Sequence, residues 1–296
     1  GIYARYTLRQ SITRPLSIRA RELAQDFDLP QASLFPFACK EAPQWQLPTT
    51  ELHTDLTQLF KRDAPPTQIL AHFHDLIGRY PGASVIYTDG SKSETGAGCS
   101  LVAENLSHTW ALSPLTTVYT AEQYAIWQSL RYCECFSMSQ PFIIVSDSLA
   151  ALTALSSRCT EDPLTQMCQQ TLKALTDNNI RIIFVWVPGH AGIPGNEAAD
   201  IAAKIAASSP IVDVPEIKLT DQKRICTKRM LEVWQHRWQN VNTQLKQIKP
   251  NVAPWKPPLN LNREQRVPLH RIRTEHTSIT HAHILLCRDP PDWQIS

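Results

Sequence analysis

The chain has 296 residues, of which 43% are hydrophobic and 19% are charged, and its formal net charge is +2. This composition is typical of a globular protein with one good core plus additional segments, and it excludes a low-complexity chain. The longest apolar runs are too short to cross a bilayer and no secretory signal opens the sequence, so we expect an intracellular protein without a membrane span, with nucleus and cytoplasm both open.

Residues 1–80 are predicted to form a partly helical, proline-rich connection. Residues 14–26 have helical character, and residues 65–79 place apolar side chains on one helical face. Between them, prolines exclude long helices and central strands; these are Pro30, Pro36, Pro43, Pro48, Pro65 and Pro66. We expect a linker that can lie over a neighbouring domain.

Residues 81–208 are predicted to form an α/β domain. Strands are expected at residues 84–89, 97–103, 108–112, 142–145 and 180–187. The first three suit an antiparallel meander. The last two are nearly continuous apolar runs, each preceded by helix, which favours parallel strands covered on both faces.

Three helices of this domain are predicted from their N-terminal signals. Thr120 and Gln123 form a capping-box pattern, and Asp162 with Pro163 forms an N-cap and first-turn pair. Asn196 is expected to cap a last helix that runs through Ala207.

Residues 209–296 are predicted to form a basic, amphipathic-helical carboxyl-terminal region. A long helix is expected over residues 220–249, with Trp234 and Trp238 packing in a core rather than stacking on bases. Between residues 217 and 275, 13 Lys and Arg stand against 4 Asp and Glu. A nucleic-acid contact and a merely solvated basic face both remain open on this pattern.

The eight cysteines are scattered without a CxxC pair, so we expect free thiols. A group of possible zinc ligands near the carboxyl terminus comprises His276, His281, His283 and Cys287. No second cysteine follows it, so scattered polar residues are the favoured interpretation and zinc binding stays open.

Four acidic residues stand at turning points of the α/β segment. Asp89 and Asp147 follow strands, Glu122 lies in the first turn of a predicted helix, and Asp200 lies in the second turn of the last one. Residues just past the carboxyl ends of neighbouring parallel strands converge in one crevice. Each acid alone has an ordinary explanation as a turn, helix-dipole or surface residue.

Together, four carboxylates at one edge would repel each other unless hard cations held them. Oxygen ligands without Cys or His suit Mg²⁺ or Mn²⁺. Two such ions about 4 Å apart can activate a water molecule and neutralise a leaving oxygen. The pattern therefore predicts phosphodiester hydrolysis.

The strings YTDGS, TAEQYA, VSDS and WVPGHAGIPGNEAAD resemble, in order and spacing, the four catalytic blocks of type 1 ribonucleases H. The four acids are separated by 33, 25 and 53 residues, and the resemblance covers residues 84–207. It implies a mixed five-stranded sheet with helices on both faces, flanked by mainly helical or irregular segments. It also implies Mg²⁺-dependent endonucleolytic cleavage of the RNA strand of RNA–DNA hybrids, leaving 3′-hydroxyl and 5′-phosphate ends.

By this resemblance Asp89, Glu122, Asp147 and Asp200 are catalytic residues that bind two Mg²⁺ ions, for which Mn²⁺ can substitute. His190, ten residues before Asp200, is implied to assist proton transfer or product release from a glycine-flanked, movable loop. The implied substrate-binding residues are Gly90, Ser91 and Glu122, which would contact RNA 2′-hydroxyls, and Asn196. For Asn196 a plain N-cap is an equal alternative.

The chain also departs from the cellular members of this family. These often carry a basic, Trp-rich handle after the third carboxylate, whereas residues 155–162 offer only a short turn. The short form and flanking strings such as WQHRW and RIRTEHTSITHAHILL are similar to the region around this domain in non-LTR retrotransposon polyproteins. We therefore expect a piece of a longer product, as the start at Gly1 without Met suggests, with a reverse transcriptase linked upstream.

Two other functions remain as alternatives. A retroelement remnant could bind nucleic acid without turnover, although the intact carboxylates argue against this. A nuclease or integrase of the same fold could act on DNA, but such enzymes usually have another acidic arrangement and lack the GHAGIPGNEAAD block.

Overall fold

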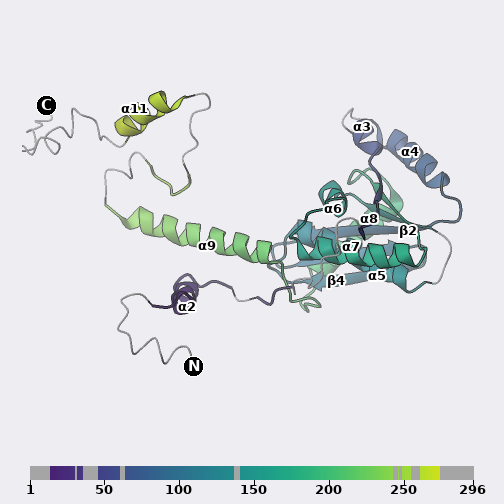
Figure 1. Cartoon of the computed structure of the whole chain (residues 1–296), viewed down its shortest axis with the longest axis horizontal. Helices are drawn as coiled ribbons and strands as arrows, with labels where there is room; N and C mark the ends of the chain where they lie inside the picture. The colour runs from purple at the N-terminus through teal and green to yellow at the C-terminus, as the bar shows by residue number, and fades with distance from the viewer. Residues whose placement is uncertain are drawn as a thin grey trace, which may run out of the picture. The chain divides into compact units, whose positions relative to one another are not determined.

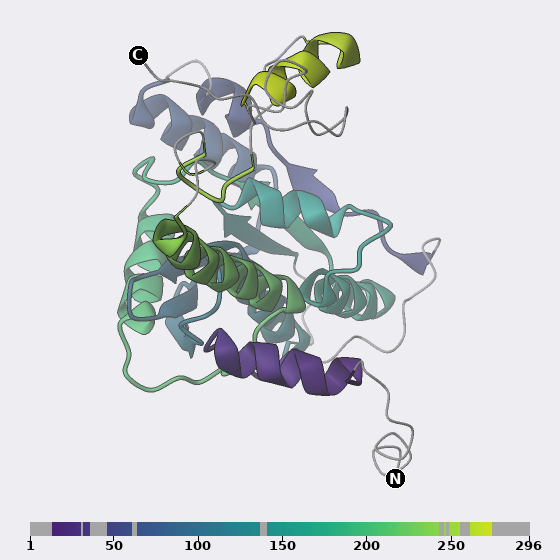
Figure 2. The ribbon, with the colours of Figure 1, turned by 90° about the vertical axis from the view of Figure 1, so that its left-hand side faces the viewer.

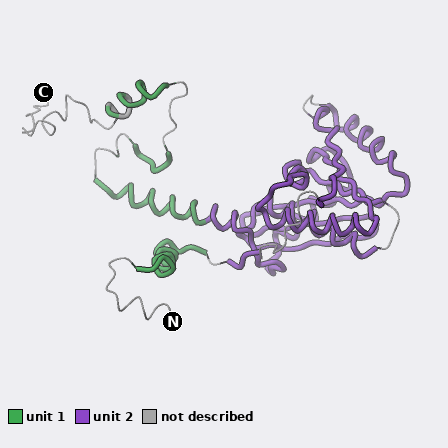
Figure 3. The backbone as a smooth tube through the Cα atoms, in the orientation of Figure 1, with its two compact units in different colours: residues 1–30, 226–296 green, residues 31–225 purple. Residues whose placement is uncertain are grey.

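The computed structural model describes residues 14–30, 32–35, 46–60, 64–136, 141–242, 246, 249–254 and 261–273. The chain divides into two compact units, shown in Figure 3. One comprises residues 31–225 and the other residues 1–30 together with 226–296. Residues flanking 81–208 on both sides, 31–80 and 209–225, therefore belong to the same compact unit as the α/β core. The domain limits at 81 and 208 stay a prediction.

The larger unit is built around a mixed sheet (Figure 1) with the strand order β1-β6-β5-β2-β3-β4. Its strands are β1 (Glu51–His53), β2 (Ser84–Lys92), β3 (Ala97–Ala103), β4 (Leu106–Leu112), β5 (Phe142–Ser146) and β6 (Ile182–Trp186). Strands β2, β3 and β4 pair antiparallel, whereas β2, β5, β6 and β1 pair parallel. Every residue of β5 and β6 is buried, as their apolar sequences predict.

The sheet has six strands among the described residues: five, β2 to β6, lie within residues 81–208 as predicted, and a sixth was not predicted. The sixth, β1, comes from the proline-rich connection and pairs with β6 at the edge of the sheet. Its three residues are too few and too polar to give a strand pattern. Tertiary contacts hold it, since Glu51 accepts hydrogen bonds from the Tyr80 hydroxyl at 2.8 Å and from the Arg181 guanidinium at 3.0 Å.

The described residues of the larger unit form six helices beside the sheet strands, and Figures 1 and 2 show their arrangement. They are α3 (Leu56–Phe60), α4 (Pro66–Gly78), α5 (Val118–Glu134), α6 (Leu149–Leu155), α7 (Pro163–Asp177) and α8 (Pro194–Ala207).

Helices α5 and α8 cover opposite faces of the sheet. Gly98 and Cys99 are consecutive in β3, so their Cα–Cβ directions point to opposite faces. A Cβ on Gly98 would lie 2.3 Å from the backbone nitrogen of Ala207 in α8, while Cys99 packs with Ala121 of α5. The predicted arrangement of helices on both faces is confirmed.

Two of the three predicted helix starts differ from the structure. Helix α5 begins at Val118 with Thr117 as its N-cap, so the predicted capping box of Thr120 and Gln123 is wrong. Helix α8 begins at Pro194 with Ile193 as its N-cap, and Asn196 lies inside the first turn. Both helices begin earlier in the chain than predicted. The side chain of Gln123 does not cap α5 but donates a hydrogen bond to the carboxylate of Asp162.

The third helix start is confirmed, since Asp162 is the N-cap of α7 and Pro163 its first residue. The Asp162 side chain makes no hydrogen bond to the helix backbone, however. Its Oδ2 atom instead accepts a hydrogen bond from the hydroxyl of Thr165 at 2.9 Å.

The smaller unit contains α2 (Leu16–Asp26), most of α9 (Leu219–Asn240) and α11 (Arg263–Arg273). Helix α9 ends at Asn240, nine residues before the predicted end at Lys249. Trp234 is 57% exposed, so the prediction that it packs in a core is wrong. Trp238 is half-buried and donates its indole N–H to the carbonyl of Lys249 at 2.8 Å. No helix of the described ranges is long and apolar enough to span a membrane.

The described cysteines are free thiols, as expected; they are Cys99, Cys133, Cys135, Cys159, Cys168 and Cys226. Burial raises the pKa of the Cys99, Cys133 and Cys168 thiols, so these behave as small apolar side chains. The four possible zinc ligands near the carboxyl terminus lie outside the described residues.

Candidate active site

Asp89 and Asp147 lie at one edge of the sheet because of the register between β2 and β5. These strands pair in parallel, and the pairing ends where Thr88 meets Ser146. Asp89 and Asp147 are the next residues of the two strands. Strand β2 itself continues to Lys92, because there it still pairs with β3. The convergence predicted for these two carboxylates is therefore present.

Glu122 reaches the same place from the second turn of α5, which lies against β2. A Cβ on Gly90 would lie 2.4 Å from the backbone nitrogen of Glu122, so only glycine allows this approach. One carboxylate oxygen from each of Asp89, Glu122 and Asp147 lies within 4.8 Å of the others. Asp89 and Glu122 are each only 5% exposed.

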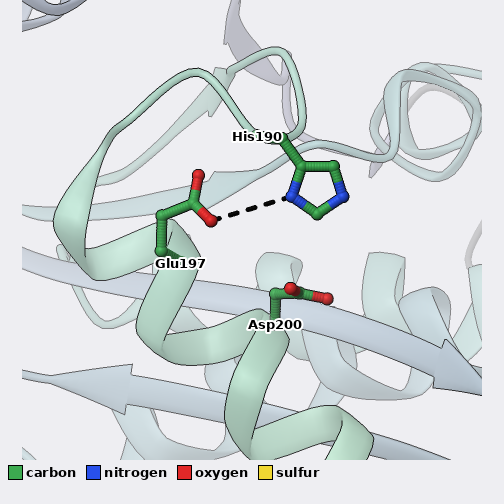
Figure 4. Close-up of side chains that lie close together, drawn as sticks. All are labelled: His190, Glu197 and Asp200. Carbon is green, nitrogen blue, oxygen red and sulfur yellow. Dashed lines mark ion pairs between the residues drawn. The ribbon is translucent and has the colours of Figure 1, made fainter.

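Asp200 belongs to a second group with His190 and Glu197, whose potential ligand atoms also lie within 4.8 Å of one another. Figure 4 shows Glu197 and Asp200 projecting from the same helix, α8, with the imidazole of His190 approaching from the preceding loop. The Nδ1 atom of His190 lies 3.7 Å from Oε2 of Glu197. The Nζ atom of Lys204 donates to Oδ2 of Asp200 at 2.6 Å.

Burial, together with repulsion between the carboxylates, raises their pKa values. Burial, followed by repulsion from Asp147 and Asp200, raises the pKa of Asp89 to about 7. Burial and then repulsion from Asp89 raise the pKa of Glu122 well above its usual range. Burial and then Asp200 raise the pKa of Asp147. The group of Asp89, Glu122 and Asp147 therefore interacts electrostatically with Asp200 of the second group. Without a cation, the carboxylates retain protons near neutral pH.

The residues present fit a divalent cation. The Oε2 atom of Glu122 is buried and has no hydrogen-bond partner among the described residues. A buried carboxylate oxygen without a partner is costly unless a proton or a cation compensates it. The donors at this edge are mainly carboxylate oxygens, which suits Mg²⁺ or Mn²⁺ better than softer metals.

His190 lies in an exposed loop with unusual backbone geometry. Its φ is 56°, in the left-handed region, and its side chain is 74% exposed. Gly192 has a φ of 76° and donates its N–H to Oε1 of Glu197 at 3.3 Å. On the other side of the loop, a Cβ on Gly189 would lie 2.8 Å from Oδ2 of Asp147. The glycines thus let this loop turn tightly beside the acidic cluster.

Sequence reasoning did not single out Glu197. The signal was present, since Glu197 precedes Asp200 by three residues in a helix and therefore shares its face. It sits in the first turn of α8, where a negative charge is favourable.

The remaining candidate residues surround the cluster. Gly90 is buried and Ser91 is half-buried in β2, directly after Asp89. Asn196 is 3% exposed, and its Oδ1 atom has no hydrogen-bond partner among the described residues. Its predicted role as an N-cap is wrong. Substrate binding by these residues stays a prediction.

Comparison with known proteins agrees with this arrangement. Residues 81–208 match the family model described as RNase H, and this range contains all four carboxylates and His190. A search of curated proteins found no match. The chain therefore contains a type 1 ribonuclease H domain, which the family model matches over residues 81–208.

Proposed function

We propose that this protein hydrolyses the RNA strand of RNA–DNA hybrids endonucleolytically with the help of Mg²⁺. The observation that carries the proposal is the cluster of the buried Asp89 and Glu122 with the half-buried Asp147, in which one carboxylate oxygen of each lies within 4.8 Å of the others inside a ribonuclease H domain. Such a cluster is unfavourable by itself and becomes favourable when it binds cations.

Asp89, Glu122, Asp147 and Asp200 would hold two Mg²⁺ ions, for which Mn²⁺ can substitute. When bound, the ions supply activation of the attacking water and neutralisation of the departing 3′ oxygen. The sheet edge would hold Asp89 and Asp147 rigidly, because they follow the buried and paired residues Thr88 and Ser146. The products would carry 3′-hydroxyl and 5′-phosphate ends.

His190 would assist proton transfer or product release. Its exposed imidazole lies in a loop that begins beside Asp147 and ends at α8, next to Asp200. Glu197 contacts both the imidazole and the backbone of this loop, so it would hold His190 near the cluster. A movable, exposed histidine at the rim suits a step that follows bond cleavage.

The choice of the RNA strand would come from 2′-hydroxyl contacts near the carboxyl end of β2. Gly90 and Ser91 would offer their backbones there, and Glu122 its carboxylate. Asn196 is a further candidate, since its carboxamide oxygen is unsatisfied among the described groups. The connection between α6 and α7 contains no basic handle. Other residues would therefore bind the phosphates of the hybrid, including the basic residues between 217 and 275.

We further propose that the chain belongs to the polyprotein of a non-LTR retrotransposon, with a reverse transcriptase linked upstream. The short connection between α6 and α7 and the strings around the domain support this proposal. The free thiols of the described cysteines suit a reducing, intracellular setting.

The experiment that tests the proposed activity compares labelled RNA–DNA, RNA–RNA and DNA–DNA duplexes across a Mg²⁺ titration. We expect cleavage of the RNA strand of the hybrid alone and none in EDTA. Asp147→Asn should lower the rate by more than about 100-fold, since even outer partners of metal ligands cost 10- to 100-fold. Asp177→Asn is the matched control, because this aspartate is exposed and lies at the end of α7.

Each alternative has its own outcome in this experiment. A silent remnant would bind the hybrid equally well as wild type and as Asp147→Asn, and would cut it in neither form. Cleavage confined to DNA would replace the proposal by a DNA nuclease of the same fold.

A further inference from the structure

The segment that follows the ribonuclease H domain folds back onto it. Asp213 and Val214 pair with the edge strand β4, where the N–H groups of both residues donate to the Ala111 carbonyl at 2.8 and 3.1 Å. The Asp213 carboxylate accepts from the N–H of Ala111 at 2.8 Å, and Ser113 donates to the Val214 carbonyl at 2.9 Å. This docking brings residues 218–221 to the first turn of α5.

Asp221 binds the N-terminus of α5 through both of its carboxylate oxygens. Oδ1 accepts from the Thr117 hydroxyl at 2.9 Å, and Oδ2 accepts from the Thr120 hydroxyl at 2.7 Å and from the Thr117 N–H at 3.3 Å. Thr117 is the N-cap of α5. Asp221 is 4% exposed, so these bonds are shielded from water and its charge lies at the positive end of the helix.

Lys218 binds the next turn of the same helix. Its ammonium group donates to Oε1 of Gln123 and lies 3.2 Å from a carboxylate oxygen of Asp162. It also lies 4.6 Å from the ring centre of Tyr119. Lys218 is 2% exposed, and a lysine this deeply buried normally has a specific partner.

Glu122 lies between the two anchored positions, Thr120 and Gln123. On its other side Gly90 leaves no free space, so α5 can shift only away from β2 or along it. A shift of either kind moves the Glu122 carboxylate relative to Asp89 and Asp147. The anchors therefore fix a side chain that they do not touch.

We propose that Lys218 and Asp221, which lie beyond the residues that match the family, are positioning residues that hold Glu122 in the acidic cluster. The inference rests on the proposed function in one respect, namely that the cluster binds divalent cations. Its consequence is that loosening this contact weakens metal binding in a protein that is still folded.

The test measures Mn²⁺ binding to the full chain by isothermal titration calorimetry, together with the melting temperature and the kcat and KM for the hybrid. We expect Asp221→Ala to raise the Mn²⁺ dissociation constant by about tenfold, the lower end of the effect of removing a direct partner of a metal ligand, and to lower kcat without changing KM. Thr120→Val, which removes the partner hydroxyl, should have the same effect. The two changes should not add in the double variant, because they remove one interaction.

Two further variants separate positioning from plain stability. Asp221→Asn keeps most of the hydrogen bonds and should restore most of the Mn²⁺ affinity. Ile217→Val removes one buried methyl group in the same segment, where the backbone bonds to Ser33 and Phe35. It should lower the melting temperature and leave Mn²⁺ affinity unchanged.

The outcomes distinguish this inference from the proposed function. A wild type that cuts the hybrid, beside a folded Asp221→Ala of unchanged Mn²⁺ affinity, overturns the positioning role and leaves the function intact. Weakened Mn²⁺ binding in Asp221→Ala, with no cleavage by the wild type, supports the positioning role and overturns the function. A wild type that binds no Mn²⁺ overturns both.

Discussion

Gly90 of β2 touches the backbone of Glu122 in α5, and this contact sets the distance between two carboxylates that belong to different elements. A Cβ at position 90 would lie 2.4 Å from the Glu122 nitrogen and 2.7 Å from the Ala121 carbonyl carbon. The Gly90 N–H also bonds to the Glu122 side chain and lowers its otherwise raised pKa. The absence of a side chain at Gly90 therefore lets Asp89 and Glu122 lie close enough for the proposed shared cation.

We predict that Gly90→Ala nearly abolishes hybrid cleavage. The new methyl group meets backbone atoms, which cannot rotate away, so α5 must move outward and take Glu122 with it. We expect a loss of roughly 1–3 kcal/mol in the free energy of unfolding, as for other overpacked sites. Urea denaturation and single-turnover cleavage check the two effects.

The control for this variant is Gly78→Ala at the end of α4, where a Cβ would meet nothing within 4 Å. There alanine should be neutral or stabilising and should leave cleavage unchanged. If Gly90→Ala cleaved the hybrid as fast as the wild type, the close approach of β2 and α5 would not be needed for cleavage.

We predict that Asp89→Asn stabilises the metal-free protein at pH 8. The pKa of Asp89 is about 7 in the folded state and about 4 in an unfolded chain. Between about pH 4 and pH 7, Asp89 holds a proton in the folded state that it has lost in the unfolded state. The free energy of unfolding therefore falls as the pH rises through this range. A neutral amide escapes this loss, and we expect a gain of roughly 2 kcal/mol at pH 8 that shrinks toward pH 5.

Urea denaturation in EDTA at the two pH values measures this effect. Glu104→Gln, in the exposed turn between β3 and β4, is the control. Adding Mn²⁺ should reverse the order, because the wild type gains more stability from the cation than the variant does. A variant less stable than the wild type in EDTA at pH 8 would contradict the cost of charging Asp89 in its buried, acidic surroundings.

We predict that Glu197→Gln lowers turnover by roughly tenfold, a value typical of residues that orient a functional group. The amide keeps an acceptor for the Gly192 N–H but removes the negative charge beside His190. The KM for the hybrid should stay unchanged, and His190→Ala should cost at least as much. Turnover at saturating hybrid checks this order, with Glu161→Gln as an exposed control. If Glu197→Gln turned over the hybrid as fast as the wild type, Glu197 would have no role in the reaction.

Much of the fold and site was predictable because local patterns and tertiary structure agree there. The buried runs of β5 and β6 have the composition of strands covered on both faces, and Asp147 follows β5 directly. The start of α5 was not predictable, because Thr117 is tied to Asp221, 104 residues later in the chain. Strand β1 and the inward position of Gln123 likewise depend on partners far away in sequence.

In the carboxyl-terminal region the sequence pattern predicted more packing than the structure has. An apolar periodicity over residues 220–249 suggested one long packed helix, but α9 ends at Asn240 and Trp234 remains exposed. Periodicity alone does not reveal whether a partner covers a helix face.

The measurement that tests the central claim most directly is anomalous scattering from a crystal soaked in Mn²⁺. We predict anomalous peaks bound by the carboxylates of Asp89, Glu122, Asp147 and Asp200, and their loss in Asp147→Asn. An intact wild-type cluster that takes up no Mn²⁺ at saturating concentration would contradict the account.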